Sequence, residues 1–394
     1  MGILRRARIR GDHAAHRGAS ELTGAVFIGS EVYRGSSYGA HHPLRVPRVS
    51  TVIDLARALG WLGGGVYRSS PRARPEAVTR WHDPAYVAAL RQAEAEGAVS
   101  AETRARHHLG TPSNPVFAQM WTRPATSAGG VLLAADLVAA GGVVHVPGGG
   151  THHGMPDRAA GFCYLNDAVL GILALRSRGL RRIAYVDLDA HHGDGVEFAF
   201  AADPEVLLVS VHEERRWPFT GRIEDAGCGN AFNLPVPAAL NDTEAAAIRE
   251  RLIVPRVGAF APEALVIQCG ADALAEDPLS RLSLSNRAYL ATLAALLPLA
   301  PRVIVLGGGG YNPWSVARLW TAVWGMLAGQ ALPERLPPEA EAVLRALAPE
   351  HAPRIGGHRA PVPEAWVTTL LDAPREGPLR AEVSARLDRL AARR

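Results

Sequence analysis

The sequence predicts an α/β fold: a single domain with a mostly parallel central sheet and helices on both faces. Short β-branched runs alternate with apolar-striped helical segments, which is typical of this class. The apolar runs are continuous rather than alternating, as expected for parallel strands buried on both sides. No long linker rich in proline, glycine and serine interrupts these patterns, so we expect one domain.

The expected strands are short apolar runs, each followed by a glycine-rich or polar loop. They are Ala25–Ile28, Val143–Val146, Ile183–Leu188, Val206–Val211, Leu265–Gln268 and Val303–Leu306. Because β-branched residues fit a pleated, buried surface, we expect these runs to form the central sheet.

The expected helices are marked by cap residues, prolines and glycines at their ends. They cover Tyr86–Ala95, Ala168–Arg178, Thr243 towards Val257, Ser285 towards Leu297, and Trp314–Leu327. Residues 330–394 are richer in proline and charge, and we expect them to form short helices that wrap the domain.

The basic charge balance, with an isoelectric point of about 9.2, would normally suggest a nucleic-acid partner, but the pattern of the basic residues argues against one. The net charge is +4, and all 42 basic residues are arginine. These arginines are scattered along the chain, apart from Arg5, Arg6, Arg8 and Arg10 near the N-terminus. This region has no apolar stretch of signal-peptide type, so we expect a flexible tail over residues 1–20 or a misassigned start rather than a secretory signal, with a transit peptide as the alternative.

Cysteine usage and hydropathy favour a cytoplasmic protein. Cys163, Cys228 and Cys269 are odd in number and widely spaced, which excludes a disulfide framework and a cysteine-based zinc site. The best apolar run, near Ala288–Ala300, is too short to span a bilayer, so no membrane partner is expected.

Chemically reactive residues follow the expected strands at their carboxyl ends. In chain order they are His152 and His153, then Asp187, Asp189, His191 and Asp194, then His212, Asp272 and Tyr311. Because ligands of open α/β sheets bind beyond the carboxyl ends of the strands, we expect these residues to converge on one site.

Asp189, His191 and Asp272 are the candidate metal ligands. In an extended chain Asp189 and His191 face the same side, so both can reach one cation. Asp272 follows another apolar strand and is the best third ligand. Three protein ligands with one open position are typical of a catalytic zinc ion. The alternative is that Asp189 and His191 form a structural hydrogen-bonded pair.

His152 and His153 lie in a glycine-rich loop that can aim both rings at a substrate. One imidazole would take a proton from water and the other would protonate the leaving group. Asp187 and Asp194 are natural partners to orient the two rings. The alternative is a pair of surface or core histidines without a catalytic role.

Tyr311 follows four glycines, Gly307 to Gly310, and is poorly explained as a packing residue. The stretch has no following lysine and does not fit a phosphate-binding loop. Its hydroxyl is better suited to stabilise an oxyanion opposite the metal.

These motifs resemble the zinc-dependent histone deacetylase family, within the arginase/deacetylase fold. The resemblance covers about Ser37 to Leu332 and is carried by Gly-Gly-Gly-x-His-His, Gly-Phe-Cys-Tyr-Leu-Asn-Asp at 161–167, Asp-Leu-Asp-x-His-His-Gly-Asp-Gly at 187–195, Gln-Cys-Gly-Ala-Asp at 268–272, and Gly-Gly-Gly-Gly-Tyr-Asn at 307–312. Pro156-Asp-Arg158 and Asp277-Pro-Leu279 are most similar to the bacterial acetoin-utilization deacetylases. The implied organisation is an arginine-rich tail over 1–20, a deacetylase domain over 21–375 and a helical tail over 376–394.

The resemblance also implies a role for each matching residue. Asp189, His191 and Asp272 would hold one zinc ion per chain, with Fe²⁺ as the alternative in the cell. His153 would be the general base beside His152, Asp187 and Asp194 their carboxylate partners, and Tyr311 the transition-state tyrosine. The acyl tunnel would be lined by Gly161, Phe162, His212 and Gly309. A potassium ion would be bound largely by backbone carbonyls of Asp187, Asp189, His191, Ser210 and Val211, and Arg48 would line an internal channel.

Two positions depart from the family pattern. Ser113 stands where many relatives place an aspartate that holds the substrate backbone. Trp217 or Phe219 would form the second tunnel wall, but the loop is unlike the eukaryotic form and does not decide between them.

The expected reaction is hydrolysis of an N-acetyl amide, with acetyl-lysine on a protein as the first choice of substrate. Acetylpolyamines or other small acetylated amines are the alternative, and Ser113 favours them. An arginase-type enzyme with two metals is a rival, but Gly270 stands where its additional carboxylate would be. A non-catalytic acetyl-lysine binding module is the remaining rival. The oligomeric state is left open.

Overall fold

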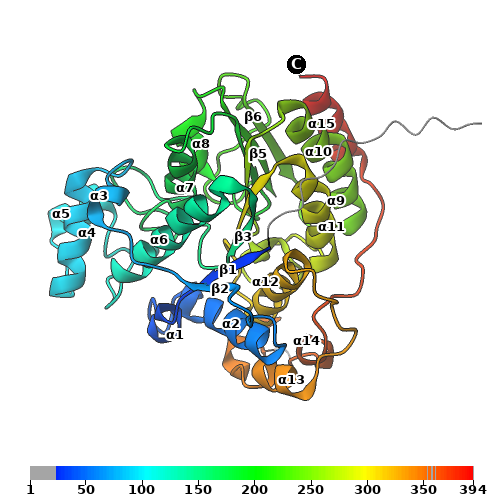
Figure 1. Cartoon of the computed structure of the whole chain (residues 1–394), viewed down its shortest axis with the longest axis horizontal. Helices are drawn as coiled ribbons and strands as arrows, with labels where there is room; N and C mark the ends of the chain where they lie inside the picture. The colour runs from blue at the N-terminus through cyan, green and yellow to red at the C-terminus, as the bar shows by residue number, and fades with distance from the viewer. Residues whose placement is uncertain (1–23, 353, 356–357, 360, 394) are drawn as a thin grey trace, which may run out of the picture.

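An eight-stranded sheet forms the centre of the molecule (Figure 1). The computed structural model describes residues 24–394 apart from 353, 356–357, 360 and 394, so the expected tail over 1–20 lies outside the described residues. All neighbouring strands of this sheet are parallel. Their spatial order is β2 (Tyr67–Ser69), β1 (Val26–Gly29), β3 (Gly142–Val146), β8 (Arg302–Leu306), β7 (Ala264–Gln268), β4 (Ile183–Asp187), β5 (Val206–Glu213) and β6 (Ala231–Val236). The predicted fold class is confirmed.

Helices connect the strands and cover both faces of the sheet. They are α1 (Val32–Gly35), α2 (Val49–Ala58), α3 (Pro75–Val78), α4 (Pro84–Glu96), α5 (Ala101–His107), α6 (Thr122–Leu137), α7 (Asp167–Arg176), α8 (Asp194–Phe200), α9 (Asp242–Ile248), α10 (Val254–Phe260), α11 (Asn286–Leu296), α12 (Pro313–Leu327), α13 (Pro338–Arg345), α14 (Glu364–Thr368) and α15 (Ala381–Ala391). A short antiparallel pair, β9 (Arg354–Ile355) and β10 (His358–Arg359), lies apart from the main sheet. Among the described residues, no helix is both long and apolar enough to cross a membrane.

Alternate residues of each strand enter two different cores. Val144 and Val146 of β3 pack with α6 and α7, whereas Val143 packs in the core on the other face, which contains α2, α11 and α12. Figure 1 shows α6, α7 and α8 on one side of the sheet and α9 to α12 on the other. Burial on both faces explains why the strands are continuously apolar.

The two edge strands were not among those expected from the sequence. β2 is only three residues long and contains Arg68, and β6 contains Asn233 and Pro235. Both strands have a neighbour on one side only, where proline and polar residues are tolerated. β5 also extends beyond the expected end at Val211, through Glu213.

The helix expected from Thr243 towards Val257 is not a regular α-helix. It begins at Asp242 with a capping box between Asn241 and Glu244, and a π turn over Arg249–Ile253 separates α9 from α10. Pro255 has no N–H to donate to the preceding turn, so the wider turn beside it relieves a missing α-helical bond.

The last helix packs on the same core as the rest of the chain. Val383, Leu387 and Leu390 of α15 are buried in the core beside α9 to α11. Arg251 donates a hydrogen bond to Ser384 at 3.0 Å, which ties α15 to the π turn. The three cysteines are free, in agreement with the absence of a disulfide framework in the sequence.

Candidate active site

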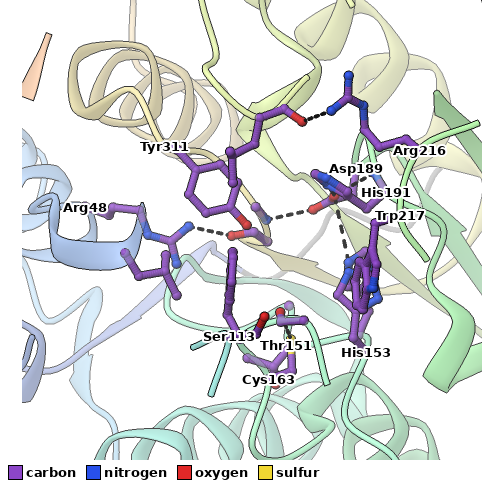
Figure 2. A pocket seen from close by; sticks show the side chains of 18 of the residues that line it. Arg48, Ser113, Thr151, His153, Cys163, Asp189, His191, Arg216, Trp217 and Tyr311 are labelled. Atoms are coloured by element: carbon purple, nitrogen blue, oxygen red, sulfur yellow. Dashed lines mark hydrogen bonds and ion pairs between the residues drawn. The ribbon is translucent and has the colours of Figure 1, made fainter. Parts of the chain in front are cut away.

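A cavity of about 650 Å³ is lined by the segments that follow β3, β4 and β8. Figure 2 shows Asp189, His191 and His153 gathered on one side of this cavity, with Tyr311 on the other. These side chains lie beyond the carboxyl ends of the strands, where ligands of parallel sheets bind.

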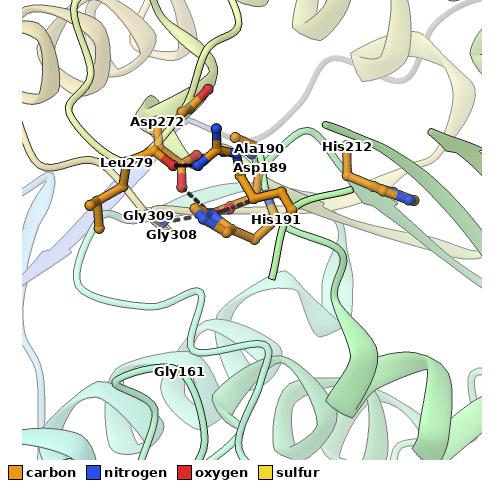
Figure 3. Close-up of polar contacts among 12 residues, drawn as sticks. Gly161, Asp189, Ala190, His191, His212, Asp272, Leu279, Gly308 and Gly309 are labelled. Carbon is orange, nitrogen blue, oxygen red and sulfur yellow. Dashed lines mark hydrogen bonds and ion pairs between the residues drawn. The ribbon is translucent and has the colours of Figure 1, made fainter. Parts of the chain in front are cut away.

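Asp189, His191 and Asp272 bring their ligand atoms together at the base of the cavity (Figure 3). Nδ1 of His191 lies 2.8 Å from Oδ2 of Asp272 and 3.3 Å from Oδ1 of Asp189. One ligand atom from each residue lies within 4.8 Å of the others, and within the described part of the chain this is the one such group of His, Cys, Asp and Glu. Two carboxylates and one imidazole suit a catalytic zinc ion.

Backbone groups and glycines hold the two carboxylates in place. The amide of Gly309 donates to Oδ2 of Asp189 at 2.7 Å, and the amide of Ala190 donates to Oδ1 of Asp272 at 2.9 Å. A Cβ atom at residue 270 would lie 2.0 Å from Oδ2 of Asp189, and one at residue 309 would lie 2.1 Å from Oδ2 of Asp272. Position 270 therefore has no room for the additional carboxylate that a dinuclear site would need.

The electrostatics of these three residues favours a positive charge at their centre. Burial opposes the charged form of His191, but hydrogen bonds to Asp189 and Asp272 outweigh burial and raise its pKa to about 10. Burial and the charge of Asp189 raise the pKa of Asp272 to about 6. A divalent cation would satisfy both carboxylates at once, so the donor set fits a metal ion.

His152 and His153 each hydrogen bond to one of the expected carboxylates. Nδ1 of His152 lies 2.8 Å from Oδ2 of Asp187, and Nδ1 of His153 lies 2.7 Å from Oδ1 of Asp194. The centres of the two rings are 3.9 Å apart. Each Nδ1 is thus engaged by a carboxylate, which leaves Nε2 as the atom of each ring that can face a substrate.

The two imidazoles differ in their tendency to carry a proton. Burial disfavours the charged form of His152, but the negative charges of Asp187 and Asp189 outweigh burial and raise its pKa to about 9. Burial and the positive charge of His152 lower the pKa of His153 to about 4, although Asp194 opposes this. The positive charge of the pair therefore resides on His152, and His153 is neutral and can accept a proton.

Tyr311 is held in its protonated form by its surroundings. Burial and the charge of Asp272 raise the pKa of its hydroxyl well above the usual value of 10.0. Its backbone amide donates to Oδ2 of Asp277 at 2.7 Å, which fixes the start of the segment before α12. A neutral phenol at this place can donate a hydrogen bond to an oxyanion.

Phe162 and Trp217 line the cavity between its base and its mouth. The Phe162 ring lies 5.9 Å from the ring of Tyr311, and the Trp217 ring lies 4.6 Å from that of His153, both at steep angles. A Cβ at residue 161 would lie 2.3 Å from the indole of Trp217, so Gly161 allows this close approach. Phe219 also lines the cavity but is 70% exposed. Trp217 is therefore the inner wall that the sequence left undecided.

His212 does not line the cavity, which corrects the sequence expectation for this residue. Its side chain is buried, with Nε2 2.9 Å from the carbonyl oxygen of Gly221 and Nδ1 2.9 Å from Oγ of Ser210. Figure 3 shows it pointing away from Asp189 and His191. The reason is that β5 continues through Glu213, so His212 faces the following loop rather than the site.

Of the remaining expected residues, Arg48 lines the cavity, whereas Asp187, Ser210 and Val211 lie in the strands behind it. Arg48 lies inside the cavity wall and donates to the carbonyl oxygens of Gly308 at 2.8 Å and Gly310 at 3.2 Å. Asp187 and Ser210 are paired across β4 and β5, behind the histidines. Val211 follows Ser210 in β5 and does not line the cavity.

Two supporting residues were missed in the sequence. The hydroxyl of Tyr185 donates to Oδ2 of Asp187 at 2.8 Å, the same oxygen that faces His152. Their spacing of two residues in one strand puts Tyr185 and Asp187 on the same face, which was the available signal. Asp277 accepts from the Tyr311 amide, and its only sequence signal was its place in Asp277-Pro-Leu279.

Comparison with known proteins gives one consistent result. The family model described as the histone deacetylase domain matches residues 42–327. The acetoin utilization protein AcuC of Bacillus subtilis is 35% identical over 329 residues, which are 80% of this chain and 85% of that protein. Histone deacetylase 8 of Xenopus tropicalis is 34% identical over 303 residues, which are 74% of this chain and 81% of that protein.

Solved structures agree with these matches. The crystal structure of a histone deacetylase homologue from Aquifex aeolicus is 34% identical and superposes with a TM-score of 0.88. It covers 94% of this chain and 100% of its own. A complex of such a homologue with SAHA gives the same identity, coverage and TM-score.

Proposed function

The chain belongs to the histone deacetylase family and is a deacetylase, and we propose that it uses one zinc ion to hydrolyse the acetyl amide of acetyl-lysine in a protein. The observation that carries this proposal is the group Asp189, His191 and Asp272 at the base of a cavity that also holds His153 and Tyr311. These are the parts that metal-assisted amide hydrolysis requires: a metal, a base and an oxyanion donor.

Asp189, His191 and Asp272 would hold the zinc ion, and Fe²⁺ is the alternative for the same ligands in the cell. Zinc bound there supplies Lewis-acid chemistry, which polarises the acetyl carbonyl and lowers the pKa of the attacking water. One metal per chain follows from the lack of space for a side chain at Gly270. We also propose a potassium ion bound largely by backbone carbonyls of Asp187, Asp189, His191, Ser210 and Val211.

The side chains around the metal would divide the proton transfers between them. Neutral His153 accepts a proton from the attacking water while Asp194 orients its ring. Tyr311 donates a hydrogen bond to the oxyanion that develops as the water oxygen bonds to the carbonyl carbon. A protonated histidine of the pair then gives a proton to the amine nitrogen as the C–N bond breaks, which releases acetate and free amine.

Metal analysis joined to a tyrosine variant tests this proposal. The chain stripped with a chelator should regain activity at one zinc ion per chain. Tyr311→Phe should keep the zinc and lose about 10²–10³-fold in kcat, because one oxyanion donor is removed. Tyr67→Phe, in edge strand β2 and outside the cavity, is the matched control. Two manganese ions at full activity, or a Tyr311→Phe variant with wild-type kcat, would contradict the proposal.

A further inference from the structure

The mouth of the cavity carries five charged side chains, which we call the charged rim: Glu213, Glu214, Arg215, Arg216 and Arg281. Glu213 is the last residue of β5, Glu214, Arg215 and Arg216 follow it, and Arg281 lies in the loop between β7 and α11. Tyr311 and His153 line the same cavity, so a substrate whose acetyl group reaches them lies close to these charges. The charges left uncompensated there therefore act on every substrate.

Both carboxylates of the charged rim are already paired. Oε2 of Glu213 lies 2.6 Å from Nε of Arg216 and Oε1 lies 2.8 Å from Nη2 of the same guanidinium. Oε2 of Glu213 also accepts from the backbone amide of Arg281 at 2.8 Å. Oε2 of Glu214 lies 2.7 Å from Nη2 of Arg386. Neither carboxylate is free to receive an ammonium group from a substrate.

Arg215 and Arg281 are different, because their guanidinium groups have no hydrogen bond or ion pair with any described residue. Both residues are exposed and both line the cavity. The backbone of Arg281 is fixed on two sides, since its amide donates to Glu213 and its carbonyl oxygen accepts from Ala239 at 2.7 Å. Glu213 is paired with Arg216 inside the charged rim and Glu214 with Arg386 outside it, so the positive charges of Arg215 and Arg281 are the two that no carboxylate of the rim neutralises.

Two aromatic residues line the same cavity as these arginines. Trp217 is 40% exposed and Phe219 is 70% exposed, and both line the cavity. Ser113, on the same cavity, adds no charge. These apolar rings offer contacts to the residues that flank an acetyl-lysine in a peptide. A small acetylated amine has no such flanking residues.

We propose that Arg215 and Arg281 select acetyl-lysine that lies next to acidic residues in a peptide segment, and that they disfavour cationic substrates such as acetylpolyamines. The proposal rests on the deacetylase function proposed above and names its substrate class. Arginine binds carboxylates well because its planar guanidinium offers several donors in a fixed geometry. At the mouth, the same charges repel the free ammonium groups of a polyamine.

A matched set of substrates tests the proposal on the full zinc-loaded chain. Three peptides would carry one acetyl-lysine flanked by glutamate, glutamine or lysine, and they would be compared with acetylputrescine and with free Nε-acetyl-lysine. The glutamate peptide should have a kcat/KM about ten-fold above the glutamine peptide at low salt, through KM, because exposed ion pairs are individually weak. The lysine peptide and acetylputrescine should fall below the glutamine peptide.

Charge-removing variants assign the preference to the two arginines. The ratio of kcat/KM for glutamate over glutamine peptides should fall about three-fold in Arg215→Gln and in Arg281→Gln, and about ten-fold when both are changed. Arg91→Gln is the matched control, because Arg91 is exposed on α4, outside the cavity. Added salt should lower the wild-type ratio and leave that of the double variant flat.

The outcomes separate this proposal from the proposed function. If the peptides are deacetylated with zinc but the ratio is one, or is unchanged in the double variant, the selection of acidic segments is wrong while the function stands. If acetylputrescine or free acetyl-lysine equals the glutamate peptide, the peptide substrate class is wrong. If no acetylated substrate is turned over by the zinc-loaded chain, the proposed function itself fails.

Discussion

The base and the mouth of the cavity are built in opposite ways. At the base, Asp189 is 1% exposed and Asp272 is fully buried, and backbone amides bind both carboxylates. At the mouth, Phe219 is 70% exposed, and Arg215 and Arg281 make no side-chain hydrogen bonds to described residues. At the base, several hydrogen bonds fix the position of each side chain, whereas few contacts fix the side chains at the mouth.

This difference teaches which part of the site can vary. A buried polar network fails when one member is left without a partner, since desolvated charges are costly. Exposed charges interact through water and contribute little each. We therefore expect changes at the base to remove activity and changes at the mouth to alter substrate preference.

After Tyr311→Phe, the largest effect is expected for Gly270→Ala at the base of the cavity. The new methyl group would lie 2.0 Å from Oδ2 of Asp189, and the carboxylate would have to move away from His191 and Asp272. Zinc affinity should fall about 10–100-fold, as when metal ligands lose their supporting contacts. Competition with a zinc-binding dye measures this loss.

Gly258→Ala is the control for that substitution. Gly258 lies in α10, and a Cβ there meets nothing within 4 Å. This variant should keep the wild-type zinc affinity and gain about 0.4–1 kcal/mol of stability, because alanine restricts the unfolded chain. Equal zinc affinity in the Gly270→Ala and Gly258→Ala variants would mean that the base is not as tightly constrained as the contacts indicate.

A smaller effect is expected for Asp194→Asn, which acts on the chemistry at the base of the cavity through His153. Asp194 favours the protonated form of His153, against burial and the charge of His152. Without that carboxylate the pKa of His153 falls below its present value of about 4. The acidic limb of the kcat/KM profile should therefore move to lower pH, and kcat should drop about ten-fold because the ring is less basic and less well oriented.

The measurement is the pH profile of kcat/KM. The control is Asp54→Asn on α2, which is half-buried and paired with Arg34. The sign is fixed by the assignment of His153 as the base, since a base works only when it is unprotonated. An acidic limb that moves to higher pH in Asp194→Asn would show that another group limits the rate.

The same contrast explains what the sequence could predict. The residues at the base of the cavity follow strongly apolar strands, which are easy to recognise in the sequence. Because parallel strands have right-handed connections, their carboxyl ends lie at the same edge of the sheet, and this brings Asp189 and Asp272 together. The edge strands β2 and β6 were missed because Arg68, Asn233 and Pro235 interrupt the apolar pattern where one side of the strand is unpaired.

The mouth was beyond prediction for a physical reason. Arg215 and Phe219 adopt positive φ angles of 56° and 63°. Non-glycine residues rarely adopt such angles, so the sequence does not predict them. The choice between Trp217 and Phe219 as the inner wall depends on this backbone. The excess charge at the mouth arises from pairing in space: Arg216 is neutralised by Glu213, whereas Arg215 beside it is not.

The smallest effect is expected for Trp217→Ala, at the boundary between the two regions. The indole lies against His153 and Gly161, so its removal opens His153 to water. Burial is the main cause of the low pKa of His153, and its pKa should rise towards 6.5 when burial is relieved. The acidic limb should then move to higher pH, opposite to the shift in Asp194→Asn, and KM should rise about five-fold as about 1 kcal/mol of apolar contact is lost.

Phe198→Ala is the control for Trp217→Ala, because Phe198 is 66% exposed on α8 and does not line the cavity. It should leave both KM and the pH profile unchanged. If Trp217→Ala instead lowers kcat as much as Asp194→Asn does, Trp217 belongs functionally to the base, and the boundary between fixed chemistry and variable selectivity lies further out, at Phe219. If the pH profiles of the two variants shift in opposite directions, the boundary lies at the indole of Trp217. This side chain would then lower the pKa of His153 by excluding water, whereas Asp194 raises it through a hydrogen bond.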